Sequence, residues 1–189
     1  MADDTYFHSP HGPLVLAGDT TKGDVPGGCM TTYHSTQGMK KYRYLYNADT
    51  VSKAAGLPCC YVMSNTTYPT LAVDQPTTAN NLEYFAGVFA ETCTSGAWVW
   101  VQTWGYNSAA ACRRYGSQES SNGLALDNLT VLDGVDALST FDGVNSGVGL
   151  GPVHVWAFMA GAVRLASVAS HGTSTTTSAC PVFIRGYIP

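Results

Sequence analysis

The stretch that most constrains how this chain can fold is residues 97–106, which read AWVWVQTWGY. In an extended chain, successive side chains point to opposite faces. One face then carries tryptophans and the other carries mostly valines: Trp98, Trp100 and Trp104 against Val99, Val101 and Thr103. Because both faces are largely apolar, we predict a central strand that is covered on each side, with Trp100 buried.

Several shorter stretches also have the pattern of strands. Residues 41–46 (KYRYLY) alternate, so that three tyrosines point one way and the intervening residues point the other. The dipeptide Asp133-Gly134 favours a tight turn, which predicts a hairpin over residues 129–138. The other predicted strands are residues 59–63, 153–159 and 182–188, and residues 82–90 are the most apolar part of the chain.

The composition agrees with a β-rich chain. Charged residues make up 12% of the sequence, about half of the roughly 25% that is usual for soluble domains. Few stretches are therefore rich in the Glu, Lys and Ala that build exposed helices. We predict an all-β or mainly β fold, with a single barrel-like or sandwich-like domain over residues 31–189 and an extended arm over the Pro- and Gly-rich residues 1–30.

The charge distribution argues against two classes of partner. The formal net charge is −4, and the only basic pairs are Lys40-Lys41 and Arg113-Arg114. Nucleic-acid binding normally uses a clustered positive field, so no nucleic-acid partner is expected. A polybasic membrane anchor is likewise missing from the sequence, and no membrane partner is expected. A weakly charged surface is typical of a subunit packed among neighbours.

The N-terminal residues and the cysteines bear on the compartment. Acidic residues stand where a signal peptide carries positive ones, and the apolar run at residues 14–17 is too short for one. We therefore expect a protein that is made and kept on the cytosolic side, with reduced, packing cysteines. In a strand, Cys59 and Cys60 point to opposite faces and cannot chelate one ion. A pairing of Cys93 with Cys112 in a mature extracellular particle stays open.

Other candidates for chemistry are weak. His8 and His11 have a spacing that two metal ligands can have, but no third ligand is near in sequence. Asp133 and Asp136 flank a turn and are interpreted as solvated. No nucleophile motif, phosphate loop or zinc-protease motif occurs. We predict no catalytic, cofactor-binding or metal site, no cofactor, and no enzymatic activity.

Three stretches resemble one family. The alternating residues 41–46, then FAGVF at residues 85–89, then GAWVWVQ at residues 96–102 stand in the order seen in head decoration (cement) proteins of tailed bacteriophages, and residues 182–185 resemble their closing strand. The resemblance covers about half of the chain, and residues 105–150 carry none of it. It implies a β-rich protein without cofactor or catalysis that binds the outer surface of a capsid. The implied partners are the major capsid protein and other copies of the chain.

Two alternatives use the same residues differently. The tryptophans of residues 97–106 could form a stacking platform in a carbohydrate- or receptor-binding module of a phage tail. A small hydrolase is the third alternative. Buried tryptophans favour the capsid protein over the stacking platform, and a pocket with convergent titratable groups would favour the hydrolase.

Overall fold

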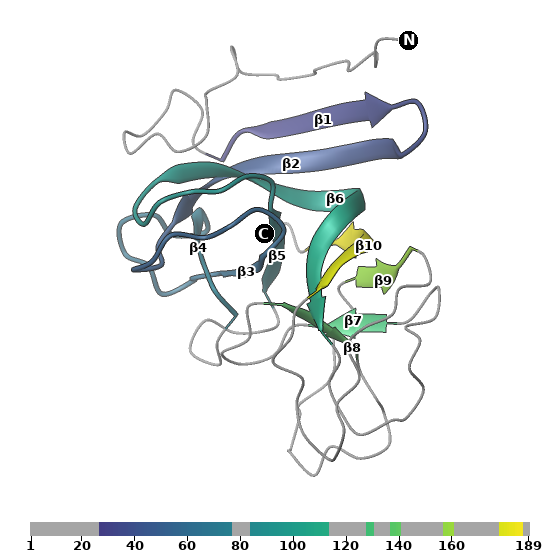
Figure 1. Ribbon diagram of the computed structural model, residues 1–189. Helices are drawn as coiled ribbons and strands as arrows, with labels where there is room; N and C mark the ends of the chain where they lie inside the picture. Colours follow the sequence, from purple (N-terminus) through teal and green to yellow (C-terminus); the bar gives the residue numbers. More distant parts are fainter. Residues whose placement is uncertain are drawn as a thin grey trace, which may run out of the picture.

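The computed structural model describes residues 27–76, 84–113, 128–130, 137–140, 157–160 and 178–186. These residues contain β-strands and no helix, so the predicted mainly β class is confirmed (Figure 1). None of them belongs to a helix long and apolar enough to cross a membrane. The strands are β1 (Cys29–His34), β2 (Gly38–Asn47), β3 (Pro58–Tyr61), β4 (Ala72–Asp74), β5 (Phe85–Phe89), β6 (Trp98–Arg113), β7 (Asn128–Thr130), β8 (Leu138–Thr140), β9 (Ala157–Met159) and β10 (Ser178–Arg185).

In the first half of the chain, the strand pairings form a closed cycle that begins and ends at β2. β2 pairs with β4, β4 with β3, β3 with β5, β5 with β6, and β6 again with β2. Every one of these strands contributes to one buried apolar cluster, which we name the first core. Its members include Leu45, Cys59, Tyr61, Val73, Ala86, Phe89, Cys93, Val99 and Val101.

The second half repeats this arrangement around the far end of the same long strand. β6 pairs with β10, β10 with β9, β9 with β7, β7 with β8, and β8 with β6. β6 has 16 residues, which is long enough to take part in both cycles of pairing, and it runs through the centre of the molecule (Figure 1). The second core includes Ala110, Cys112, Leu129, Leu138, Ala157, Cys180, Val182 and Ile184, with Cys60, Phe85 and Val88 from the first half.

The alternation predicted for residues 97–106 is confirmed over the first part of β6. Val99 and Val101 lie in the first core, whereas Trp98 and Trp100 lie on the opposite face, against Tyr44 of β2. Trp100 is 8% exposed and Trp98 is 1% exposed. The predicted burial of Trp100 is therefore confirmed, and β6 is a central strand covered on both faces.

The prediction for Trp104 is wrong. Tyr42 stands opposite Gln102, but its neighbour Lys41 stands opposite Trp104, so Thr103 is an extra residue in the β6 ladder. Such a bulge reverses the alternation of the residues that follow it. Trp104 consequently leaves the face of the other tryptophans, and its ring meets that of Phe183 in β10 edge-on, with centroids 5.2 Å apart.

Two further predictions are confirmed where the structure describes them. The alternating tyrosines occur in β2, and the predicted strand at residues 59–63 corresponds to β3. The predicted hairpin is wrong in its register. β7 and β8 are antiparallel, but Leu129 stands opposite Thr140, whereas a two-residue turn at Asp133-Gly134 places it opposite Leu138. The Asp133-Gly134 turn itself lies outside the described residues. Of the arm predicted over residues 1–30, the last four residues are described, and two of them begin β1. The barrel or sandwich stays a prediction.

Candidate binding groove

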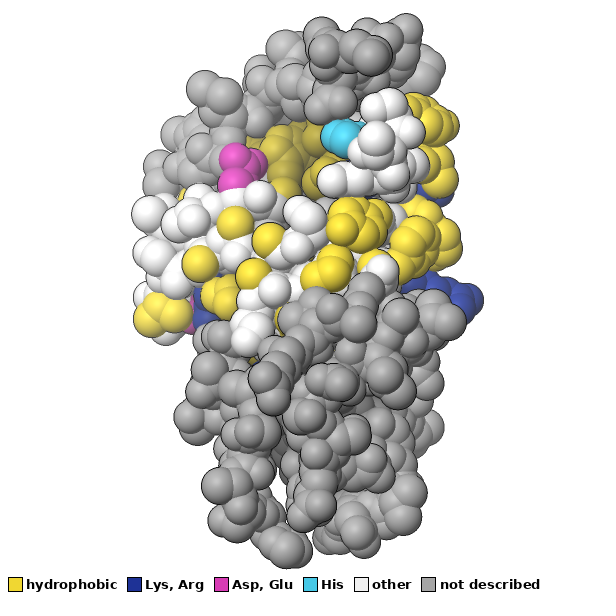
Figure 2. Space-filling view, turned by 45° about the vertical axis from the view of Figure 1, so that its right-hand side comes forward, with side chains coloured by type: hydrophobic (Ala, Val, Ile, Leu, Met, Phe, Trp, Pro, Cys, Tyr) yellow, Lys and Arg dark blue, Asp and Glu magenta, His cyan; other side chains and the backbone are white. Residues whose placement is uncertain are grey.

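A groove of about 360 Å³ lies beside the hairpin formed by β1 and β2 (Figure 2). β1 and β2 are antiparallel, from Cys29 opposite Arg43 to His34 opposite Gly38. The hairpin supplies one wall, and the segment after β5 together with β6 supplies the other. The lining residues are Met30, Thr32, Tyr33, His34, Lys40, Tyr42, Ala90, Glu91 and Trp100.

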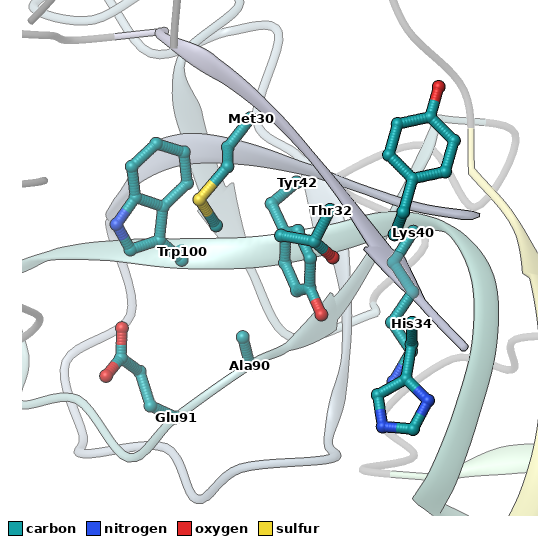
Figure 3. Close-up of a pocket in the computed structure, with 9 residues that line it drawn as sticks. Met30, Thr32, His34, Lys40, Tyr42, Ala90, Glu91 and Trp100 are labelled. Carbon is teal, nitrogen blue, oxygen red and sulfur yellow. The ribbon is translucent and has the colours of Figure 1, made fainter. Parts of the chain in front are cut away.

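The floor of the groove is apolar and rigidly supported. Met30 and Trp100 are each 8% exposed, and Figure 3 shows their side chains next to each other on the side of the groove near Glu91. The ring of Tyr44 supports Trp100 from the interior, with centroids 5.0 Å apart and planes tilted by 48°. The backbone N–H of Ala90 donates to the Trp100 carbonyl at 2.9 Å, which holds the segment after β5 against β6 within one wall of the groove.

Polar groups stand along the groove rather than at one point. Tyr42 and Thr32 are joined by a side-chain hydrogen bond, and burial raises the pKa of Tyr42. Burial also raises the pKa of Glu91 and lowers that of Lys40, whose ammonium donates to Gln37 Oε1 at 2.5 Å. Figure 3 shows the Glu91 carboxylate at one end and Lys40 at the other. The groove therefore has an acidic end, a basic end and an aromatic floor, which suits an elongated ligand.

The turn of the hairpin holds the histidine at the rim. The backbone N–H of Thr36 donates to His34 Nδ1 at 3.3 Å, and the Thr36 hydroxyl lies 3.1 Å from the same nitrogen. In Figure 2 this histidine, in cyan, stands beside the hollow whose floor is apolar. Because contacts within the hairpin turn orient the ring of His34, we assign this histidine a structural role at the rim of the groove.

Strand β1 forms an edge next to the groove. Within the described part of the chain it pairs with β2 and with no other strand. Its sequence, CMTTYH, contains no proline and no lysine, arginine or acidic residue. Those are the devices with which proteins normally protect an edge strand from pairing with another chain. Tyr33, near the end of β1, is 52% exposed.

Five of the six cysteines lie in the two cores, and Cys29 in β1 is exposed. Cys59 belongs to the first core and Cys60 to the second, so the prediction that they face opposite ways is confirmed. The open pairing of Cys93 with Cys112 is not what the structure shows, because these residues lie in different cores. Cys112 instead shares its core with Cys180. All six cysteines are free thiols.

The remaining candidates from the sequence do not form a site in the described residues. His8, His11, Asp133 and Asp136 lie outside them. Within the ranges that are described, no three His, Cys, Asp or Glu side chains gather where they could hold a metal ion. The groove was missed by sequence reasoning. Its walls come from two stretches of the sequence that are about sixty residues apart. Neither stretch has a motif that predicts its contact with the other.

Comparison of the chain with protein-family models, with curated proteins and with solved structures found no significant match, so its function has to be inferred from its own residues.

Proposed function

We propose that this protein is a structural subunit of a virion, which binds the outer surface of a tailed-phage capsid and stabilises the shell. The observation that carries the proposal is the neutral edge of β1 beside the groove, where β1 pairs with β2 alone among the described residues. The partner is an extended segment of the major capsid protein, which adds to β1 as a further strand. Its side chains on one face then enter the groove, and neighbouring copies of the chain complete the contacts around the shell.

Strand addition suits a cementing role. Main-chain hydrogen bonds along β1 supply affinity with little demand on sequence, and the groove supplies specificity through alternate side chains. Each contact is of modest strength, but many copies on one shell act together and raise the overall avidity. The low charge of the chain agrees with such repeated neutral contacts.

The state of the tryptophans supports this function over the stacking-platform alternative. A sugar stacks on an exposed aromatic face, but Trp98 is 1% exposed and packs on Tyr44 with ring centroids 5.7 Å apart. The titratable groups of the groove are also spread along its length, which does not favour a hydrolase.

We expect a lysine in the edge strand to weaken capsid binding. The variant Tyr33→Lys adds an ammonium to β1, and burying this charge against a partner costs at least about 1–3 kcal/mol. Half-maximal occupancy should then need about tenfold more protein. The measurement adds purified protein to capsids that lack it and quantifies the bound copies after sedimentation.

The matched control is Val51→Lys. Val51 is 54% exposed, similar to Tyr33, but it lies in the loop after β2 and not in the groove. This variant should bind capsids like the unmodified protein. Equal occupancy of all three proteins would discard the role of β1, and failure of the unmodified protein to bind any capsid would discard the proposed function itself.

One observation keeps the carbohydrate-binding module as a second candidate: Trp100 and Tyr42 both line the groove. Titration calorimetry with oligosaccharides from bacterial cell surfaces distinguishes the two functions. We expect no saturable heat. A saturable signal that is lost in Trp100→Phe and kept in Tyr33→Lys would favour the sugar-binding module instead.

A further inference from the structure

Two cysteines meet inside the second core. In the antiparallel pair of β6 and β10, Cys112 stands opposite Ser178 and Cys180 stands opposite Ala110. The two cysteines are therefore diagonal neighbours on one face of the sheet, the arrangement in which side chains on adjacent strands can touch. Both are fully buried in the same cluster, and their side chains are hydrogen-bonded to each other.

The hydrogen bond makes the two thiols unequal. It lowers the pKa of Cys180 and raises the pKa of Cys112, and burial raises the latter further. Of the two sulfurs, that of Cys180 therefore carries negative charge more readily. A thiolate is the nucleophilic form of cysteine, so Cys180 is the more reactive partner. The Cys180 thiol also lies 3.5 Å from the Ser178 carbonyl, as a donor to it.

The other buried cysteines lack this activation. Burial raises the pKa of Cys60 to about 12 and that of Cys93 to about 11, and the pKa of Cys59 lies well above its ordinary value. Cys59 and Cys60 are adjacent in one strand and face different cores. Their thiols are therefore less readily ionised than that of Cys180.

The backbone next to Cys180 can adjust to a covalent bond. The register of β10 against β6 shifts between Cys180 and Val182, where the single residue Pro181 of β10 faces two residues of β6, Ser108 and Ala109. A bulge increases local twist and releases the strand from strict ladder geometry. Diagonal cysteines stand somewhat farther apart than an unstrained disulfide prefers, and a bulge beside one of them allows the small approach that the bond needs.

We propose that Cys112 and Cys180 are an oxidation site, at which a two-electron oxidant such as hydrogen peroxide forms a disulfide that joins β10 to the central strand β6. The Cys180 thiolate attacks one oxygen of the peroxide, which gives a sulfenic acid and releases hydroxide. The Cys112 sulfur then displaces the sulfenic hydroxyl as water, and a sulfur–sulfur bond forms. In total, two thiols and one peroxide give one disulfide and two waters. The proposal requires only an oxidising environment and does not depend on capsid binding.

The bond would stabilise the end of the chain. β10 is held to the rest of the second core by β6 on one side and by β9 on the other. Because a disulfide between positions 112 and 180 closes a long loop, it restricts the unfolded chain strongly. The reduced protein can thus fold in a reducing cytoplasm and become more stable after release from the cell.

The test treats the reduced, purified full-length protein with hydrogen peroxide under native conditions, followed by peptide mapping without reductant. We expect one cross-linked peptide pair, which contains Cys112 and Cys180, and an increase in melting temperature on the order of 5–15 °C that reductant reverses. The variant Cys112→Ser should accumulate a sulfenic acid at Cys180 that dimedone traps. The control Cys93→Ser, in the first core, should form the disulfide like the unmodified protein.

Peptide mapping of the unmodified protein tests the proposal even if a variant fails to fold. A cross-link between other buried cysteines would overturn the proposal, and so would oxidation of Cys180 to a sulfinic acid without any bridge. Absence of a reaction at both cysteines, while the protein remains folded, would overturn it as well.

Discussion

Replacing Gly87 by alanine is expected to abolish or nearly abolish folding. Gly87 lies in β5 with a φ of +151°, a conformation that residues with a Cβ rarely adopt. A Cβ at this position would lie 2.0 Å from the carbonyl oxygen of Gln102 in β6, and 2.8 Å from its carbon. Both obstacles are backbone atoms of the central strand, so β5 and β6 would have to separate.

The expected loss in the free energy of unfolding is more than about 3 kcal/mol, because strain of the backbone and separation of paired strands act together. This is a large share of the roughly 5–15 kcal/mol that stabilises an ordinary domain. Urea-induced unfolding, followed by tryptophan fluorescence, measures the loss where folded protein can be obtained.

Gly38 is the matched control. Its φ is +72°, and a Cβ there would meet no atom within 4 Å. Gly38→Ala should therefore cost only about 1–2 kcal/mol, from the left-handed backbone alone. If the two substitutions destabilise the protein equally, the close approach of β5 to β6 is not what requires glycine at position 87.

Removal of the Trp98 side chain is expected to have the second largest effect. Trp98 is 1% exposed and is the largest fully buried side chain of the described residues. Its ring stacks on Tyr44 at 5.7 Å and meets Tyr46 and Tyr68 edge-on at 5.7 and 5.3 Å. These tyrosines come from β2 and from the loop before β4, so the indole joins parts of the chain that are distant in sequence.

Trp98→Ala should cost about 3–5 kcal/mol through lost burial and the cavity that remains, with up to about 1 kcal/mol more for each aromatic contact. The comparison is Phe183→Ala, which removes a ring that is 36% exposed and should cost about 1 kcal/mol. Thermal unfolding of both variants measures which substitution causes the larger loss of stability. An equal effect of the two substitutions would contradict the role of the aromatic cluster.

The sequence by itself determined the class of fold and the two faces of its main strands. Residues 97–101 and 41–46 show why: the alternation of side chains in a strand is local, so a run of alternating tyrosines or of tryptophans and valines predicts both the strand and its buried faces. Tyr44 and Trp100 are buried on one face, and Leu45 and Val99 on the other, as this alternation requires. The opposite orientations of Cys59 and Cys60 follow from the same period.

Only the tertiary structure decided the features that depend on which strands are neighbours. The bulge at Thr103 arises from the register of β6 against β2, and it moves Trp104 from its predicted face to a contact with Phe183. The groove needs the hairpin of β1 and β2 to lie next to Glu91. Likewise, the proximity of Cys112 to Cys180 depends on β10 returning to β6. Such contacts join residues far apart in sequence, and a local pattern carries no information on which distant strand completes the sheet.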